Sequence, residues 1–230
     1  MTHASPAIEE ILEQIQRLED RSGAARTKIL SERLGLSLGT VTNTLSRLQR
    51  LGLARRVPYK GTQLTTEGRK VALSVLRRHR LLERLLTDVL HIRWSKAHDV
   101  ACKLEHAVDD EVANAIESAL AYPKTCPHGN VIPPRAGQVS SQVSTRLTEL
   151  SPHDAGTLVR VLDEEEEGAL EHLDSIGLTP GAEFTVDDRV AFDEAVVVRL
   201  GKSKVTVSKR AASLVAVKKR EKMRSSAGRA

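Results

Sequence analysis

Aromatic residues are scarce in this sequence: 2 Phe, 2 Tyr and 1 Trp make up 2% of its 230 residues. Hydrophobic cores must therefore be built from Leu, Val, Ile and Ala. No apolar run approaches the roughly 18–20 residues that a membrane helix needs, and the polar segment 1–10 lacks the apolar core of a signal peptide. The two cysteines, Cys102 and Cys126, are too few for a disulfide framework. These absences predict a cytoplasmic protein without a membrane partner.

Charge is distributed unevenly along the chain, whose net charge is +5. Residues 1–70 hold 12 Lys and Arg against 7 Asp and Glu, whereas residues 151–217 hold 7 against 13. Residues 218–230 are again basic, with 6 Lys and Arg against 1 Glu. A basic N-terminal block is compatible with nucleic acid binding, although a similar excess is common in proteins without that role.

The N-terminal block has the pattern of a winged helix-turn-helix. Apolar residues at i, i+3, i+4 and i+7 predict an amphipathic helix over 8–18. Two helices follow over 27–34 and 38–51, joined by a tight turn with a capping Ser37, which is the spacing of a helix-turn-helix. A strand, turn and strand over 53–64 predict the wing.

The second of these short helices presents a polar face opposite its apolar residues. Asn43 can pair with adenine and Arg47 with guanine. Gly39 and Thr40 are small, which allows close approach to a groove floor, and nearby cations could contact phosphates. The predicted DNA-binding residues are Arg26, Lys28, Ser37, Gly39, Thr40, Asn43, Arg47, Arg50 and Lys60. The alternative is a plain three-helix packing unit with a solvated face, but helices, wing and charge together favour DNA binding.

The middle of the chain predicts two long helices. The first runs over 67–90, and the second, capped by Ser95, runs over 96–121. Prolines and glycines over 121–138 then indicate irregular chain and a domain boundary.

From residue 145 the hydrophobic period changes to two, which predicts short strands. Together with a short helix over 169–176, these strands indicate a small barrel. The predicted domains are a DNA-binding domain over 1–70, a helical domain over 71–138, a β domain over 145–217 and a basic tail over 218–230.

Six potential metal ligands lie on the two predicted long helices. His79 and Glu83 lie four residues apart on the first helix. The other four occupy positions i, i+4, i+7 and i+8 on one face of the second helix and are His98, Cys102, Glu105 and His106. Imidazole, thiolate and carboxylate groups bind divalent transition metals. Each residue alone has a plain interpretation as core or solvated surface, but the joint spacing favours two metal centres.

These motifs resemble the diphtheria toxin repressor family of metal-dependent regulators nearly from end to end. The resemblance rests on the helix-turn-helix and wing, on HRLLERLLTDVL at 79–90, on HDVACKLEHAVDDEV at 98–112 and on CPHGNVIPP at 126–134. It implies a multidomain, mainly α fold with a winged helix-turn-helix, a helical dimerisation domain and a C-terminal Src-homology-3-like β-barrel. It also implies a homodimeric, metal-activated repressor of metal-uptake genes rather than an enzyme.

The resemblance further implies two metal sites in each subunit. The ancillary site is His79, Glu83 and His98. In some members a Glu-x-x-Glu/Gln pair completes it, a pattern that Glu164 and Glu167 fit, although their acidic run can equally be a solvated loop.

The primary site implied by the resemblance is Cys102, Glu105 and His106 with one ligand from the first helix. That ligand is Glu10 here, where the iron-type branch has Met and the manganese-type branch an acid. Because Glu10 is a hard ligand and Cys102 a soft one, the chain combines features of both branches. We expect Mn²⁺, with Fe²⁺ close behind.

Metal binding at the primary site would join the first helix to the dimerisation helices. We expect this to set the two recognition helices of a dimer for a palindromic double-stranded DNA operator. We expect the apolar residues Val108, Val112 and Ile116 to form the dimer face, and the alternative is that they belong to the intramolecular core. Alternatives are a DNA-binding protein with a structural cluster, a metal buffer, and a di-metal enzyme, which would need Glu-x-x-His pairs that these helices lack.

Overall fold

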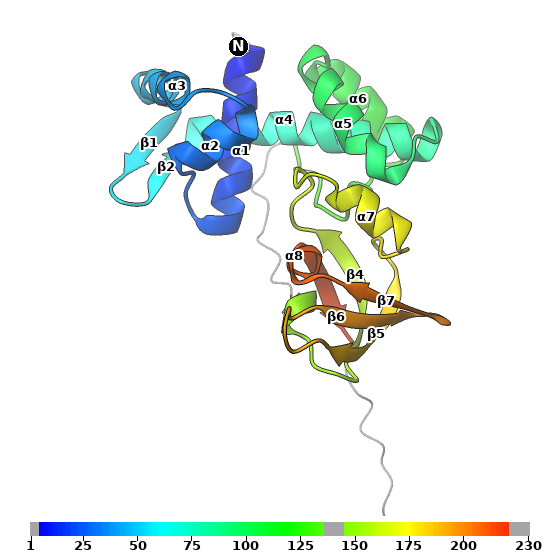
Figure 1. Cartoon of the computed structure of the whole chain (residues 1–230). Helices are drawn as coiled ribbons and strands as arrows, with labels where there is room; N and C mark the ends of the chain where they lie inside the picture. Colours follow the sequence, from blue (N-terminus) through cyan, green and yellow to red (C-terminus); the bar gives the residue numbers. More distant parts are fainter. Residues whose placement is uncertain (1–4, 136–144, 221–230) are drawn as a thin grey trace, which may run out of the picture. The chain divides into compact units, whose positions relative to one another are not determined.

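The computed structural model describes residues 5–135 and 145–220, which form two compact units (Figure 1). One unit comprises Met1–Leu86, Asp99–Lys124 and Ile132–Ser141, and the other comprises Thr87–His98, Thr125–Val131 and Gln142–Ala230. The chain therefore passes between the units more than once. Among the described residues, no helix is long and apolar enough to cross a bilayer.

The N-terminal part of the first unit is a winged helix-turn-helix, as the sequence predicted. Its elements are α1 (Pro6–Ser22), α2 (Thr27–Leu34), α3 (Leu38–Arg50), β1 (Ala54–Val57) and β2 (Gly61–Leu64) (Figure 1). The two strands pair antiparallel, with Ala54 opposite Leu64. Leu12, Ile15 and Leu48 are fully buried in the core that these elements share.

Local sequence determines the turns of this domain. Gly35 ends α2 with φ 62°, in the left-handed region that favours glycine. Ser37 begins α3, because its side-chain oxygen accepts a hydrogen bond from the Thr40 backbone N–H at 3.1 Å. At the wing, a Cβ atom on Gly61 would lie 2.4 Å from the Ala25 carbonyl oxygen, so the close approach of these two backbones requires glycine.

The helix after the wing begins as predicted and ends differently. Thr65 caps α4 (Thr66–Arg84) by accepting a hydrogen bond from the Gly68 N–H at 3.2 Å. The predicted helix ran to residue 90, but a π-helical turn over Leu85–Val89 follows α4 instead.

The single helix predicted over 96–121 is wrong. The chain forms α5 (Trp94–Leu104), a 3-10 turn over Glu105–Ala107 and then α6 (Asp110–Ala119). Val108 is extended, with φ −95° and ψ 122°. Asp109 then caps α6 by accepting a backbone hydrogen bond at 2.8 Å. A capping Asp beside a β-branched residue favours a new helix start over continuation, which the apolar periodicity did not reveal.

One further prediction for this segment is wrong, and another is decided for one of its three residues. Ser95 is not a helix cap, because α5 begins one residue before it and its hydroxyl donates to Asp174 at 2.8 Å. The proposed apolar stripe is divided: Ile116 is buried within its own unit, Val112 is 47% exposed and Val108 is half-buried. Ile116 therefore belongs to the intramolecular core.

The second unit contains a six-stranded antiparallel sheet in the order β3-β8-β4-β5-β6-β7. The strands are β3 (Thr145–Arg146), β4 (Ala155–Val161), β5 (Glu183–Arg189), β6 (Val196–Leu200), β7 (Ser203–Val207) and β8 (Val215–Lys219), with helices α7 (Ala169–Ser175) and α8 (Lys209–Ser213). Alternating spacing over 157–162, 183–186, 195–200, 204–207 and 214–217 predicts β4 to β8, and the helix predicted over 169–176 corresponds to α7, whereas β3 and α8 were not predicted. The first two residues of the predicted tail lie in β8 and pair with β4, and residues 221–230 lie outside the described chain.

Part of the predicted boundary segment is an ordered hairpin of this second unit. Residues Thr125–Val131 close a tight turn, and the Val161 N–H donates to the His128 carbonyl oxygen at 2.9 Å. Gly129, at φ 86°, lies so close to β4 that a Cβ atom would be 2.0 Å from the Val159 carbonyl oxygen. The hairpin therefore packs directly on β4. The last residues of the predicted segment, 136–138, lie outside the described chain.

Candidate metal centres and DNA-facing surface

One cluster joins α1 to the 3-10 turn that follows α5. Glu10 Oε2 lies 3.1 Å from His106 Nε2, and Glu105 Oε1 lies 3.5 Å from the same nitrogen. The candidate ligand atoms of these three residues all lie within 4.8 Å of one another. The structure thus brings together three of the four predicted primary ligands. Two carboxylates and an imidazole are a donor set suited to Mn²⁺ and Fe²⁺.

A second cluster shares Glu105 with the first. His79 Nδ1 lies 2.6 Å from Glu105 Oε2, and Glu13 completes a buried group of three. On the other side of the ring, His79 Nε2 lies 2.9 Å from Glu83 Oε1. Since Glu105 directs one oxygen toward each histidine of the two clusters, its carboxylate has the placement of a bridging ligand.

Glu13 was missed by the sequence analysis. A signal for it was present, because Glu10 and Glu13 are three residues apart and therefore share one helical face. The resemblance implies a single ligand from this helix, and Glu13 lies one turn beyond Glu10.

The surroundings of these groups favour bound protons or another cation. Burial raises the pKa of Glu13 to about 7, partly offset by the Arg17 charge. Burial would lower the pKa of His79, but the Glu83 charge and hydrogen bonds to its neighbours raise it well above its usual range. The hydrogen bond to Glu10 raises the pKa of His106 to about 9 despite the opposing effect of burial. The raised pKa values of His79 and His106 reflect the carboxylates around these rings, whereas the raised pKa of Glu13 reflects mainly its burial.

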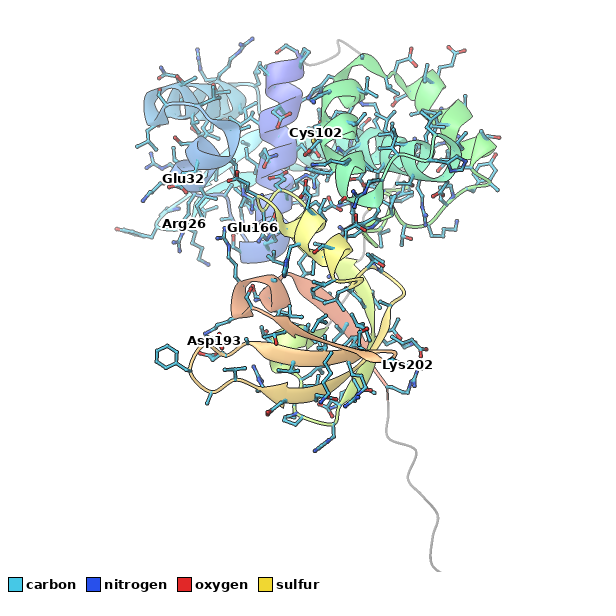
Figure 2. The ribbon with its side chains drawn as sticks, turned by 45° about the vertical axis from the view of Figure 1, so that its right-hand side comes forward. Arg26, Glu32, Cys102, Glu166, Asp193 and Lys202 are labelled. Carbon is cyan, nitrogen blue, oxygen red and sulfur yellow. The ribbon has the colours of Figure 1, made fainter. Side chains whose placement is uncertain are left out.

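Cys102 lies apart from the Glu10 cluster. It sits on α5 with an exposed side chain (Figure 2), and its Sγ is 4.0 Å from His79 Nδ1. Within the described chain, the group formed by Glu10, Glu105 and His106 does not include it. Because α5 ends at Leu104, Cys102 and Glu105 do not continue one helical face. Coordination by Cys102 in the same centre as Glu10 stays a prediction.

A third cluster lies inside the C-terminal unit, around the buried carboxylate of Glu164. Glu164 Oε1 lies 3.6 Å from Cys126 Sγ and 3.6 Å from His128 Nδ1, and Glu164 Oε2 lies 3.9 Å from His98 Nδ1. Asn130 donates a hydrogen bond to Oε1 at 2.6 Å. The tight hairpin carries three of these side chains, so its docking on β4 builds the cluster.

The sequence analysis did not count Cys126 and His128 as ligands. Their Cys-x-His spacing within a Pro- and Gly-rich loop was a usable signal, but the residues that face them are distant in sequence. A glutamate 36 positions after His128 cannot be paired with it from periodicity alone, since only the packing of the hairpin on β4 brings them together.

The predicted ancillary site draws on both compact units and stays a prediction. His79 and Glu83 belong to the first unit, and His98 and Glu164 to the second. Glu164 is buried, in keeping with a ligand, whereas Glu167 is exposed. The two halves of the predicted Glu-x-x-Glu pair therefore have different surroundings.

Every predicted DNA-binding residue is exposed on the helix-turn-helix or the wing. These residues are Arg26 (Figure 2), Lys28, Ser37, Gly39, Thr40, Asn43, Arg47, Arg50 and Lys60. Leu38, at the start of α3, is also 54% exposed. Ser37 has a structural use as well, because it caps α3. The polar face of α3 is therefore available to a partner along its length.

Three family models match consecutive segments of the chain. Residues 3–62 match the N-terminal DNA binding domain of the iron dependent repressors, and residues 65–134 match their metal binding and dimerisation domain. Residues 145–219 match the FeoA domain. The antiparallel sheet of the C-terminal unit is thus a Src-homology-3-like domain, as expected from the sequence.

Several relatives share most of this chain. The iron-dependent repressor IdeR of Mycobacterium leprae is 34% identical over 220 residues, which cover 90% of this chain and 95% of that protein. The diphtheria toxin repressor of Corynebacterium glutamicum is 39% identical over 122 residues, covering 53% of this chain and 54% of its own.

Solved structures show the same fold over nearly the whole length. A manganese-dependent transcriptional repressor in complex with manganese has a TM-score of 0.83 and 31% identity, covering 92% of this chain and 99% of its own. The structure of T. acidophilum IdeR has a TM-score of 0.78 and 26% identity, covering 94% and 98%. On this combination of sequence identity, coverage and domain order, the chain belongs to the diphtheria toxin repressor family of metal-dependent transcriptional regulators.

Proposed function

We propose that this chain is a DNA-binding repressor that acts as a homodimer and is activated by Mn²⁺ or Fe²⁺. The observation that carries the proposal is the convergence of Glu10, on the first helix of the DNA-binding domain, with Glu105 and His106 from the segment matched to metal binding and dimerisation. Relatives named as iron-dependent and manganese-dependent repressors support the same function. They also favour a regulator over an enzyme.

The donor set fits two metal ions that share a carboxylate. Glu10, Glu105 and His106 would hold one ion, and Glu13, Glu105 and His79 the other. When bound, the ions supply positive charge in place of the protons that the raised pKa values of Glu13 and His106 indicate. The predominance of oxygen ligands supports Mn²⁺, with Fe²⁺ as the close alternative.

A path of direct contacts leads from this centre to the wing. Glu10 lies on α1, which packs along α4. Further along α1, Glu19 Oε1 accepts a hydrogen bond from the Leu64 backbone N–H of β2 at 2.7 Å. Fixing the start of α1 therefore restrains the element to which the wing is attached. In a two-fold dimer, we expect recognition helices about 34–36 Å apart, or a multiple, on a palindromic operator.

The cluster around Glu164 is proposed as a further metal centre. Cys126, His128 and His98 provide a soft donor and two imidazoles, which suit a transition metal such as Fe²⁺, Co²⁺ or Zn²⁺. The single tryptophan offers a direct readout, because the ring centroids of Trp94 and His128 are 4.9 Å apart. Paramagnetic Co²⁺ at this centre is expected to quench Trp94 fluorescence in wild type and not in Cys126→Ser with intact folding. Equal quenching in both would contradict the assignment.

The switch is tested by fluorescence anisotropy with genomic promoter fragments. Wild type and Glu10→Ala are titrated in chelator, in Mn²⁺ and in anaerobic Fe²⁺. We expect metal to tighten binding by the wild type, and the variant to lose that response while keeping its binding in chelator. Binding unaffected by chelator would instead indicate a metal-independent DNA-binding protein, and metal binding without salt-sensitive DNA binding would indicate a metal buffer.

A further inference from the structure

Glu9 lies beside the Glu10 cluster without belonging to it. Its side chain is 8% exposed and its Oε2 accepts a hydrogen bond from Arg78 Nη2 at 2.7 Å. The same oxygen lies 3.0 Å from His106 Nδ1. Arg78 is as deeply buried, at 5% side-chain exposure. One carboxylate oxygen thus connects a buried guanidinium on α4 to a candidate metal ligand.

A buried Arg–Glu pair is weak evidence for a contribution to stability. Removing both charges from water is costly, and apolar residues of similar size often stabilise a fold equally well. The contact with His106 gives the pair a different role. In a neutral imidazole, one nitrogen donates a hydrogen bond and the other accepts one.

Each ring nitrogen of His106 faces a carboxylate, Nδ1 that of Glu9 at 3.0 Å and Nε2 that of Glu10 at 3.1 Å, so the tautomer decides which nitrogen is free to bind metal. Donation from Nδ1–H to Glu9 leaves the lone pair on Nε2, which points toward Glu10 and Glu105 at 3.1 and 3.5 Å. A hydrogen bond from the second ring nitrogen orients metal-binding histidines and raises their basicity. Arg78 in turn fixes Glu9, since a guanidinium presents its donors in a rigid plane.

We propose that Arg78 and Glu9 are positioning residues for His106, holding its ring so that Nε2 faces the ion shared with Glu10 and Glu105. This inference rests on the proposed function, because it assigns a role toward the same metal centre. Glu9 does not bind the metal in this scheme. Its charge is neutralised by Arg78 on one side, and it accepts the ring N–H on the other.

The competing explanation is that the pair only docks α1 on α4. The chain contains a matched control for it nearly three turns further along α1, where Glu19 Oε2 accepts a hydrogen bond from Arg69 Nη2 at 2.6 Å. That pair also links α1 to α4. Its second carboxylate oxygen meets the Leu64 backbone instead of a histidine.

The experiment compares Glu9→Gln with Glu19→Gln in the full-length chain. Mn²⁺ affinity is measured by competition with a fluorescent chelator, and stability by urea unfolding without metal. We expect Glu9→Gln to weaken Mn²⁺ binding by about 10–100-fold, the usual effect of losing such a partner. Glu19→Gln should stay within about twofold of wild type. In the Co²⁺-loaded protein, the hyperfine-shifted His106 Nδ1–H should exchange with solvent faster in Glu9→Gln than in wild type.

A further variant covers the case in which Glu9→Gln does not fold. Arg78→Lys keeps a positive charge beside Glu9 without the rigid guanidinium plane, and it should weaken Mn²⁺ binding less than Glu9→Gln. Wild-type Mn²⁺ affinity in both Glu9→Gln and Arg78→Lys would overturn the positioning role. A loss of Mn²⁺ affinity in Glu19→Gln equal to that in Glu9→Gln would overturn it as well. Neither result would contradict the proposed function. Failure of the wild type to bind Mn²⁺ would overturn the proposed function and the inference together.

Discussion

We expect the proton on His106 to make the stability of the metal-free protein depend on pH. The hydrogen bond to Glu10 raises the pKa of His106 from 6.5 to about 9, and the hydrogen bond to Glu9 adds to this effect. The folded state therefore holds this proton more tightly than the unfolded chain. Its contribution to stability is complete below pH 6.5 and is lost as the pH rises to about 9.

In chelator, the thermal midpoint of wild type should consequently fall more steeply between pH 6.5 and 9 than that of His106→Gln. Mn²⁺ affinity should rise over the same interval, because the proton must leave before the ring can bind a metal. Differential scanning fluorimetry and metal competition across the interval test both trends. Parallel stability profiles for wild type and His106→Gln would contradict the assigned pKa.

Sequence patterns predicted individual ligands better than they predicted their grouping. Residue type and spacing singled out Glu105 and His106, the family resemblance added Glu10, and the structure brings the three together. Glu13 was missed because sequence alone does not distinguish a buried glutamate on a helix from an ordinary solvent-exposed one. The partners of Glu164 could not be inferred because no periodicity connects a loop with a strand end in another part of the chain.

Two glycines in helices illustrate how packing changes the effect of the same substitution. Replacing a helical glycine by alanine favours the helix by up to about 1 kcal/mol. At Gly68 on α4, however, the new Cβ would lie 1.9 Å from the Leu53 carbonyl oxygen. At Gly39 on α3, its nearest neighbour would be the Ser37 Oγ at 3.8 Å.

We therefore expect opposite signs from the two variants. Gly68→Ala should lower the free energy of unfolding by about 1–3 kcal/mol, because backbone must move to admit the methyl group. Gly39→Ala should leave it unchanged or raise it by less than about 1 kcal/mol. Urea unfolding in chelator measures both. A Gly68→Ala protein as stable as wild type would show that the turn before the wing is not packed as described.

The recognition helix and the wing should affect DNA binding in different ways. Asn43 lies exposed on α3, where it can read a base edge, and Lys60 lies exposed in the wing, where it can meet a phosphate. Asn43→Ala should cost about 1–3 kcal/mol on the operator and little on unrelated DNA. Lys60→Ala should weaken both and reduce the salt slope by about 1. Anisotropy titrations at several salt concentrations separate these outcomes. An operator-specific loss in Lys60→Ala and a general loss in Asn43→Ala would contradict the two assigned roles.

At the scale of elements, capping residues were more informative than periodicity. The boundaries of α2 and α3 agree closely with prediction because Gly35 and Ser37 mark them chemically. The helix predicted over 96–121 failed because apolar spacing continues across the break, while Asp109 starts a new helix. This break matters for the site, because it places Glu105 and His106 in a 3-10 turn.

Across the whole molecule, domain order followed from changes in hydrophobic period, since a change from helical to alternating spacing marks a change of architecture. The changes in hydrophobic period did not predict which segments of the chain belong to which compact unit. The hairpin of residues 125–131 belongs to the C-terminal unit although it precedes that unit's sheet by sequence. Such a contribution depends on backbone approach at Gly129, which no local pattern encodes. The proposed metal centre around Glu164 therefore depends on elements that sequence order separates.

If metal binding and DNA binding are coupled through α1, the coupling must act in both directions. A coupling free energy of about 1–3 kcal/mol would tighten operator binding about 5–150-fold when metal is present. Thermodynamic linkage then requires operator DNA to tighten Mn²⁺ binding by the same factor. Mn²⁺ titrations with and without operator, compared with operator titrations with and without Mn²⁺, should return equal factors, and both should approach one in Glu10→Ala. Operator binding could instead depend on metal while operator DNA leaves the Mn²⁺ affinity unchanged. That result would show that metal acts by another route, such as promoting dimer formation before the protein binds DNA.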